Sequence, residues 1–107
     1  MINYSNSKIY FIRQQDTGEI IWSGGTVSSL KRRYYNHISN KNDLLHRTVS
    51  AMDLNWRDLK IEMIKDYDNC QDRKRLNFAA EVALMYYRQN DDEVYQHFLD
   101  NIEYFIE

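Results

Sequence analysis

Four residues of this chain have side chains whose chemistry suits work on a phosphodiester. Arg33 and His37 are four positions apart, so in a helix they share one face. Tyr10 offers a hydroxyl from a stretch typical of a strand, and Glu81 offers a carboxylate from a long apolar segment. Cleaving a phosphodiester needs a cation for the phosphate oxygens, a base for the attacking water and a divalent metal to neutralise charge. Arginine, tyrosine, histidine and glutamate are residue types that can meet those needs.

Glu81 has two interpretations when only its neighbours are considered. The residues around it are small or apolar: Ala79, Ala80, Val82 and Ala83. A carboxylate buried among such groups requires a counter-charge or a metal, because burying an unpaired charge is costly. A glutamate on the exposed side of a helix is the commoner outcome. Both interpretations, metal ligand and solvent-exposed helix residue, stay open at this point.

The composition is that of one globular domain spanning residues 1–107, with 43% hydrophobic and 28% charged residues. No apolar run approaches the roughly 20 residues that a transmembrane helix needs, so we expect no membrane association. The segment Met1–Asn6 lacks the basic and apolar regions of a secretory signal. A single cysteine, Cys70, cannot form an internal disulfide. We therefore expect an intracellular, cytoplasmic protein.

The charge is unevenly distributed along the chain. The formal net charge is −2, which on its own argues mildly against a nucleic-acid binder. Residues 1–89, however, hold all 14 Lys and Arg against 10 Asp and Glu, whereas residues 90–107 hold six acids and no Lys or Arg. The body is therefore modestly basic and the tail acidic, which is compatible with one phosphate-facing side.

The first forty residues predict a hairpin followed by a helix. Residues 8–14 are β-branched and aromatic enough for a strand, Gln15–Gly18 supplies turn chemistry, and residues 19–23 return as a second strand. We expect Gly24-Gly25 to end that strand and Thr26 to cap the helix that follows. The helix has apolar residues at spacings of four: Leu30, Tyr34 and Ile38.

The second half predicts one more strand and at least two helices. The stretch 40–57 is compatible with a short helix or with a wrapped loop, and residues 59–66 alternate with a period of two, as a half-buried strand does. Asp68 or Asn69 is expected to cap a helix that continues to about residue 89. A final acidic helix is expected over about residues 91–106, opening with acids at its dipole-positive end.

The order of these pieces resembles the GIY-YIG nuclease superfamily, in the form of a small stand-alone domain. Lys8-Ile9-Tyr10 is similar to the first motif of the family, and Trp22-Ser23-Gly24 to the second. The segment Leu30–His37 is similar to the helix that carries the family's arginine and, four residues later, its histidine or tyrosine. Asn55–Glu62 and the approach from Asn69 to Glu81 also fit, so the likeness covers residues 8–90.

The resemblance implies a fold and a set of roles. The implied fold is α/β (α+β): a three-stranded antiparallel sheet flanked by helices, here with an extra C-terminal helix. Glu81 would hold one Mg²⁺ or Mn²⁺, Tyr10 with His37 would handle the attacking water, and Arg33 would stabilise the phosphate. We expect these four residues to converge on one concave face, with Trp22 beside them.

Two departures from the family pattern bear on activity. Lys8 replaces a glycine, which a strand tolerates, and Trp22 replaces the second motif tyrosine. An indole N–H donates one hydrogen bond and has no acidic hydroxyl. Two hypotheses follow: a divalent-metal-dependent endonuclease that hydrolyses phosphodiester bonds in DNA, or a catalytically inactive module of the same fold that binds nucleic acid or a nucleic-acid-binding protein.

The partner implied by the resemblance is DNA, either branched or bound without sequence preference. The residues expected to contact it, beyond the catalytic set, are Trp22, Thr26, Lys31, Arg32 and Tyr34. The basic run Lys31–Arg33 is equally typical of a solvated helix face, except that Arg33 has the family register. The acidic C-terminal helix is a candidate surface for a protein partner.

Overall fold

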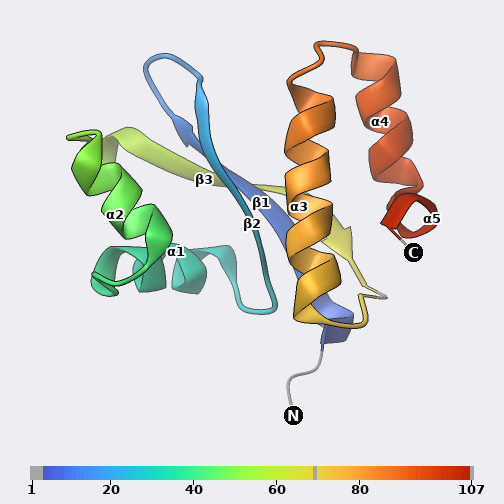
Figure 1. Cartoon of the computed structure of the whole chain (residues 1–107), viewed down its shortest axis with the longest axis horizontal. Coiled ribbons are helices and arrows are strands. Elements are labelled where there is room, and N and C mark those ends of the chain that lie inside the picture. The colour runs from blue at the N-terminus through green and yellow to red at the C-terminus, as the bar shows by residue number, and fades with distance from the viewer. Residues whose placement is uncertain (1–3, 69, 107) are drawn as a thin grey trace.

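The computed structural model describes residues 4–68 and 70–106 and has a three-stranded antiparallel sheet with helices on both faces (Figure 1). The strands are β1 (Ser7–Gln14), β2 (Ile20–Thr26) and β3 (Leu59–Tyr67), in the order β2-β1-β3. The helices are α1 (Leu30–Ser39), α2 (Leu44–Ala51), α3 (Arg73–Tyr87), α4 (Asp92–Asp100) and α5 (Ile102–Ile106), with short 3-10 turns at Tyr4–Asn6 and Trp56–Asp58. The predicted α+β class and antiparallel sheet are confirmed.

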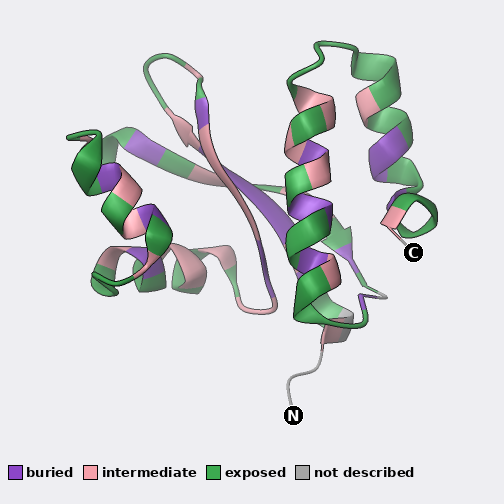
Figure 2. Cartoon of the chain, in the orientation of Figure 1, coloured by how far each residue is buried: buried purple, intermediate pink, exposed green. Residues whose placement is uncertain are grey.

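The central strand β1 divides the interior into two apolar cores. Its side chains alternate between the two faces, as the pleat of a strand requires. Ile9 and Phe11 pack with residues of α3, α4 and α5, whereas Tyr10 and Ile12 pack with residues of α2 and with half-buried apolar residues of α1. All four residues are fully buried, and Figure 2 shows burial concentrated on β1 and on the helix faces turned toward the sheet.

The two consecutive glycines lie inside β2, which corrects the prediction that they end the strand. Gly24 is the cross-strand partner of Tyr10. A Cβ atom at Gly24 would lie 2.5 Å from Tyr10 Oη, and one at Gly25 would lie 2.6 Å from Leu76 Cδ1 of α3. Both distances are too short for real carbon atoms, so each glycine admits a close approach: the phenol on one face of the sheet and α3 on the other.

Two helix caps also differ from those predicted. The N-cap of α1 is Ser29 rather than Thr26, because β2 extends to Thr26, and Ser29 Oγ accepts a hydrogen bond of 3.2 Å from the Arg32 amide. The N-cap of α3 is Asp72 rather than Asp68, and its Oδ1 accepts from the Arg75 amide at 2.8 Å. The alternative cap Asn69 lies outside the described residues.

The ambiguous stretch 40–57 contains α2 and then loop, and the expected helix over about 91–106 is two helices. The break falls at Asn101, whose side-chain amide donates to the His97 carbonyl at 2.9 Å and closes α4. Helix α5 follows at once. Across residues 4–68 and 70–106, none of the helices has the length and apolar character needed to cross a lipid bilayer.

Candidate active site at the edge of β2

The Tyr10 hydroxyl is the centre of a hydrogen-bonded cluster that joins β1 to α1. Tyr10 Oη lies 2.8 Å from His37 Nε2, and Arg33 Nε donates to the same oxygen at 3.3 Å. Arg33 and His37 reach one phenol because they are one helical turn apart on α1. Gly24 lacks the side chain that would occupy the space of the hydroxyl. The local fold therefore assembles three of the four residues proposed from the sequence.

Asp43 extends this cluster and was not anticipated from the sequence. It lies immediately before α2, and its Oδ2 accepts a hydrogen bond from His37 Nδ1. His37 is fully buried, so both of its ring nitrogens are occupied by protein groups. An aspartate ahead of an apolar pair such as Leu44-Leu45 is typical of a helix N-cap, which gives no sign of a partner on the preceding helix.

Trp22 approaches the same cluster from β2. It is the cross-strand partner of Ile12, two positions from the Tyr10–Gly24 pair, so it lies on the Tyr10 face of the sheet. Its ring centroid is 6.4 Å from that of His37, edge-on at 74°. The Trp22 side chain also lowers the pKa of Tyr10, in the same direction as Arg33. Trp22 therefore acts on the ionisation of the phenol and also packs edge-on against His37.

Burial and charge act in opposite directions on the two titratable groups of the cluster. Burial raises the pKa of Tyr10, and hydrogen bonding to Arg33, its positive charge and the Trp22 donor reduce that rise. Burial lowers the pKa of His37, the Asp43 carboxylate opposes that change and Arg33 adds to it. The imidazole of His37 is thus favoured in its neutral form, in which one ring nitrogen can accept a proton.

A cavity of about 550 Å³ runs along the free edge of β2 and brings Arg33 and Glu81 to one site. Helices α1 and α3 cover opposite faces of the sheet, but β2 is an edge strand and both helices border that edge (Figure 1). The residues that line the cavity are Tyr10, Ile21, Trp22, Ser23, Gly24, Gly25, Arg33, Leu44, Asn77, Glu81, Leu84 and Arg88. His37 is not among them, because it lies behind Tyr10.

The phenol of Tyr10 is closed to solvent. The residue borders the cavity and yet has 0% exposed surface, whereas Trp22 and Arg33 are half-buried and Glu81 is exposed. Arg33, which donates to the Tyr10 hydroxyl, and Trp22 both line the cavity beside it. Access to the phenol therefore requires a movement of one of these two side chains.

The donor set at the cavity suits a metal that is only partly held by protein. Glu81 is the single carboxylate among the residues that line the cavity. Within residues 4–68 and 70–106 there is no group of three or more His, Cys, Asp or Glu side chains that could hold a metal ion. A closed structural zinc or calcium site is thus absent from the described part of the chain. Mg²⁺ commonly takes one or two carboxylates, several waters and substrate phosphate oxygens, which one exposed glutamate fits.

The residues expected to contact nucleic acid fall into two groups. Lys31 and Arg32 are exposed on α1, and Trp22 lines the cavity. Thr26 is buried, and its Oγ1 accepts from the Ser28 amide at 3.0 Å. Tyr34 is half-buried, and its hydroxyl donates to the Trp56 carbonyl at 2.6 Å. Thr26 and Tyr34 therefore make contacts within the fold, which leaves the first group as the accessible one.

Besides Glu81, helix α3 and its C-cap Arg88 contribute cavity residues that the sequence analysis did not propose. Asn77, Glu81, Leu84 and Arg88 follow one another at intervals of four, three and four, so they lie on one helix face. Arg88 is exposed and provides a second cation besides Arg33. Helical spacing from Glu81 identifies the residues that share its face, but only the structure shows that this face borders β2.

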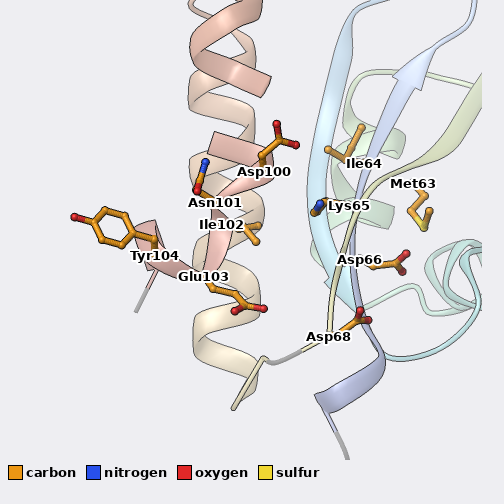
Figure 3. A pocket seen from close by; sticks show the side chains of 10 residues that line it. All are labelled: Met63, Ile64, Lys65, Asp66, Asp68, Asp100, Asn101, Ile102, Glu103 and Tyr104. Carbon is orange, nitrogen blue, oxygen red and sulfur yellow. The ribbon is translucent and has the colours of Figure 1, made fainter. Parts of the chain in front are cut away.

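A second hollow, of about 730 Å³, has the opposite electrostatic character. It lies between the end of β3 and the α4–α5 junction (Figure 3). Four acids line it, Asp66, Asp68, Asp100 and Glu103, against the single cation Lys65. Such a lining disfavours a phosphate. The cavity at the edge of β2 is therefore the better candidate for phosphodiester chemistry.

Comparison with known protein families, with curated proteins and with solved structures finds no match to this chain.

Proposed function

We propose that this protein is a divalent-metal-dependent endonuclease that hydrolyses phosphodiester bonds in DNA. The observation that supports this best is the Tyr10–His37 hydrogen bond, with Arg33 on the same phenol, at the end of a cavity that also holds Glu81. A base, a cation and a carboxylate around one cavity are the components such a reaction needs. The GIY-YIG resemblance supports the same assignment.

Arg33 has the role of the phosphate-binding cation in this proposal. Its guanidinium donates one hydrogen bond to Tyr10 through Nε, and an arginine has further N–H donors beyond that one. A phosphodiester in the cavity would accept from those donors and draw the guanidinium outward. That movement opens the Tyr10 hydroxyl to the attacking water, so substrate binding and exposure of the base are coupled.

Tyr10 and His37 act as one base. Tyr10 accepts the proton of the attacking water while its own proton passes to His37 Nε2, 2.8 Å away. Glu81 would hold the divalent metal, which when bound supplies positive charge for the phosphate oxygens. The body of the chain, with its net positive charge and the exposed Lys31 and Arg32, favours a polyanionic substrate.

The decisive experiment incubates the purified protein with supercoiled plasmid and with branched DNA, in Mg²⁺, Mn²⁺ or EDTA. We expect cleavage with metal, none in EDTA, and a loss of cleavage in Glu81→Gln. Glu81 is exposed, so the variant should keep the circular dichroism spectrum and melting temperature of the wild type. The matched control is Glu93→Gln, an exposed helix glutamate remote from the cavity lining, which should cleave normally. Full cleavage by Glu81→Gln would rule out the metal assignment.

A second candidate function is a non-cleaving module that binds branched nucleic acid. It is favoured by one observation, that Tyr10 borders the cavity and yet has no exposed surface. The same reactions distinguish the two: retarded migration of branched DNA with no nicking in either metal supports the binding module, and metal-dependent nicking supports the nuclease.

A further inference from the structure

Asp43 occupies a helix N-cap position but does not cap its helix. An N-cap aspartate usually accepts a hydrogen bond from a backbone amide of the first turn. Ser29, Asp72 and Asp91 do so at α1, α3 and α4. The Asp43 side chain makes no cap hydrogen bond with α2 and accepts from His37 Nδ1 instead. The contact with His37 thus exists at the expense of a stabilising cap, which points to a use for it.

The contact determines which nitrogen of His37 carries the proton. A neutral imidazole has a single N–H, and an ionised carboxylate can only accept. The proton therefore lies on Nδ1, facing Asp43, and Nε2 has a free electron pair. Tyr10 Oη is 2.8 Å from Nε2, so the Tyr10 hydroxyl must donate to it. The lone pairs of the phenol oxygen are then left for Arg33 and, once the site opens, for water.

We propose that Asp43 is the positioning residue of a Tyr10–His37–Asp43 proton relay, an inference that rests on the proposed nuclease function. The water O–H bond breaks as its electron pair forms the new P–O bond, and that proton passes to the Tyr10 oxygen. The phenol proton passes to His37 Nε2. The P–O bond to the leaving sugar oxygen breaks, and that oxygen leaves with the electron pair and takes a proton from solvent. The Asp43 carboxylate stabilises the imidazolium that forms.

The surroundings of His37 make this carboxylate necessary. The ring is fully buried, hydrogen-bonded to Tyr10 of β1 and to Asp43, and Trp22 of β2 meets it edge-on. His46 of α2 reaches only its carbonyl, at 3.1 Å. Burial and the Arg33 charge both disfavour a cation here, and Asp43 is the one group favouring it among the causes that act on the His37 pKa. Without Asp43, proton transfer from Tyr10 would create an unsupported buried cation.

The test measures the His37 tautomer and the cleavage rate on the same proteins. Two-dimensional NMR of ¹⁵N-histidine-labelled wild type should show the Nδ1–H tautomer for His37. In Asp43→Asn the amide can donate to Nδ1, so the Nε2–H tautomer should appear. Its cleavage rate should then fall on the order of 10⁴-fold, the size of effect when the orienting aspartate of a Ser-His-Asp triad becomes asparagine. Asp43→Glu keeps a carboxylate and should recover part of the rate.

The matched control is Ser29→Ala, which removes a true cap without any contact to His37. It should lower stability but change neither the tautomer nor the rate. An Nε2–H tautomer in the wild type, or wild-type cleavage by Asp43→Asn, would overturn the relay while leaving the nuclease assignment intact. A wild type that cleaves nothing overturns the nuclease assignment, and the relay with it, whatever the tautomer.

Discussion

Trp22 acts on the ionisation of Tyr10 through a polar group that phenylalanine lacks. The indole lowers the pKa of Tyr10, in the same direction as Arg33. Trp22→Phe should therefore raise the pKa of Tyr10 and reduce the cleavage rate on the order of 10-fold, about the loss expected for one hydrogen bond. Because the relay uses Tyr10 in its protonated form, the rate should be lower at every pH without a shift of the profile, which rates measured from pH 6 to 10 test.

A control for that prediction is Ile21→Val, which trims the same cavity wall and removes no polar group. Its pH profile should coincide with that of the wild type. Equal rates at every pH for Trp22→Phe and wild type would mean that the indole serves packing alone.

His37 makes a prediction that holds whether or not the protein is an enzyme. Its pKa is lowered in the folded state, mainly by burial, so the unfolded chain binds a proton more readily. This contribution to stability is complete above the unfolded pKa of about 6.5 and is lost as pH falls from there to the folded pKa, at up to about 1.4 kcal/mol per pH unit. Denaturant unfolding of wild type and His37→Gln at pH 7.5, 6.5 and 5.5 measures it.

The wild type should lose more of its free energy of unfolding over this range than His37→Gln, because the variant has no imidazole to titrate. A wild type that instead gains stability relative to the variant at pH 5.5 would mean that the Asp43 carboxylate outweighs burial.

At the scale of elements, Gly25 sets how closely α3 packs on β2. Gly25→Ala should destabilise the protein by about 1–3 kcal/mol, because the new methyl group meets the Leu76 side chain in a filled core. Leu76→Ala should itself cost about 2–5 kcal/mol. In the double variant the methyl group has room. The loss of unfolding free energy in the double variant should therefore be smaller than the sum of the losses in the two single variants. Thermal or denaturant unfolding of the four proteins gives this coupling.

The same four unfolding free energies can also contradict the prediction. Additive costs for Gly25→Ala and Leu76→Ala would show that the two residues do not contact each other, and hence that α3 lies farther from β2.

The elements were predictable where their signals are local. The hairpin turn at Gln15–Gly18 and the strand over 59–66 were predicted from residues next to one another, and both elements appear in the structure. The position of Gly24-Gly25 inside β2 was not predictable in this way, because it depends on the packing of Tyr10 and of α3 against opposite faces of the strand. The start of α3 was mistaken for a similar reason, because several neighbouring residues can cap a helix and packing selects one.

The candidate site also has a part that was predictable from local spacing and a part that was not. Arg33 and His37 share a face by helical spacing, which the sequence states directly. The turn of Asp43 toward His37, and the meeting of α3 with the Trp22 edge of the sheet, depend on how separate elements pack. Those contacts could be found only in the folded chain.

At the scale of the whole molecule, charge separates the two hollows. Lys31 and Arg32 are exposed on α1, whereas acids line the hollow between β3 and α4–α5. DNA should therefore approach α1 and the β2 edge. The double variant Lys31→Gln/Arg32→Gln should reduce the slope of log K against log salt by about 0.9 for each lost phosphate contact. Fluorescence anisotropy with a labelled duplex between 50 and 200 mM salt, roughly the range over which such contacts weaken, measures this slope.

The corresponding control is Asp66→Asn/Asp100→Asn on the acidic hollow, which should leave the slope unchanged. A steeper slope in that variant would mean that the phosphates reach the β3 side of the molecule.

The adjacent glycines of β2 also have a consequence for how the hairpin folds. A slip of β2 by one residue in one direction would put Ser23 under the Tyr10 hydroxyl, and a slip in the other would put Thr26 against Leu76. Either error introduces a Cβ where no room exists, although the backbone hydrogen bonds alone would tolerate both pairings. Two residues without side chains thus act as a proofreading device, which admits one alignment of the strand and rejects its nearest competitors on either side.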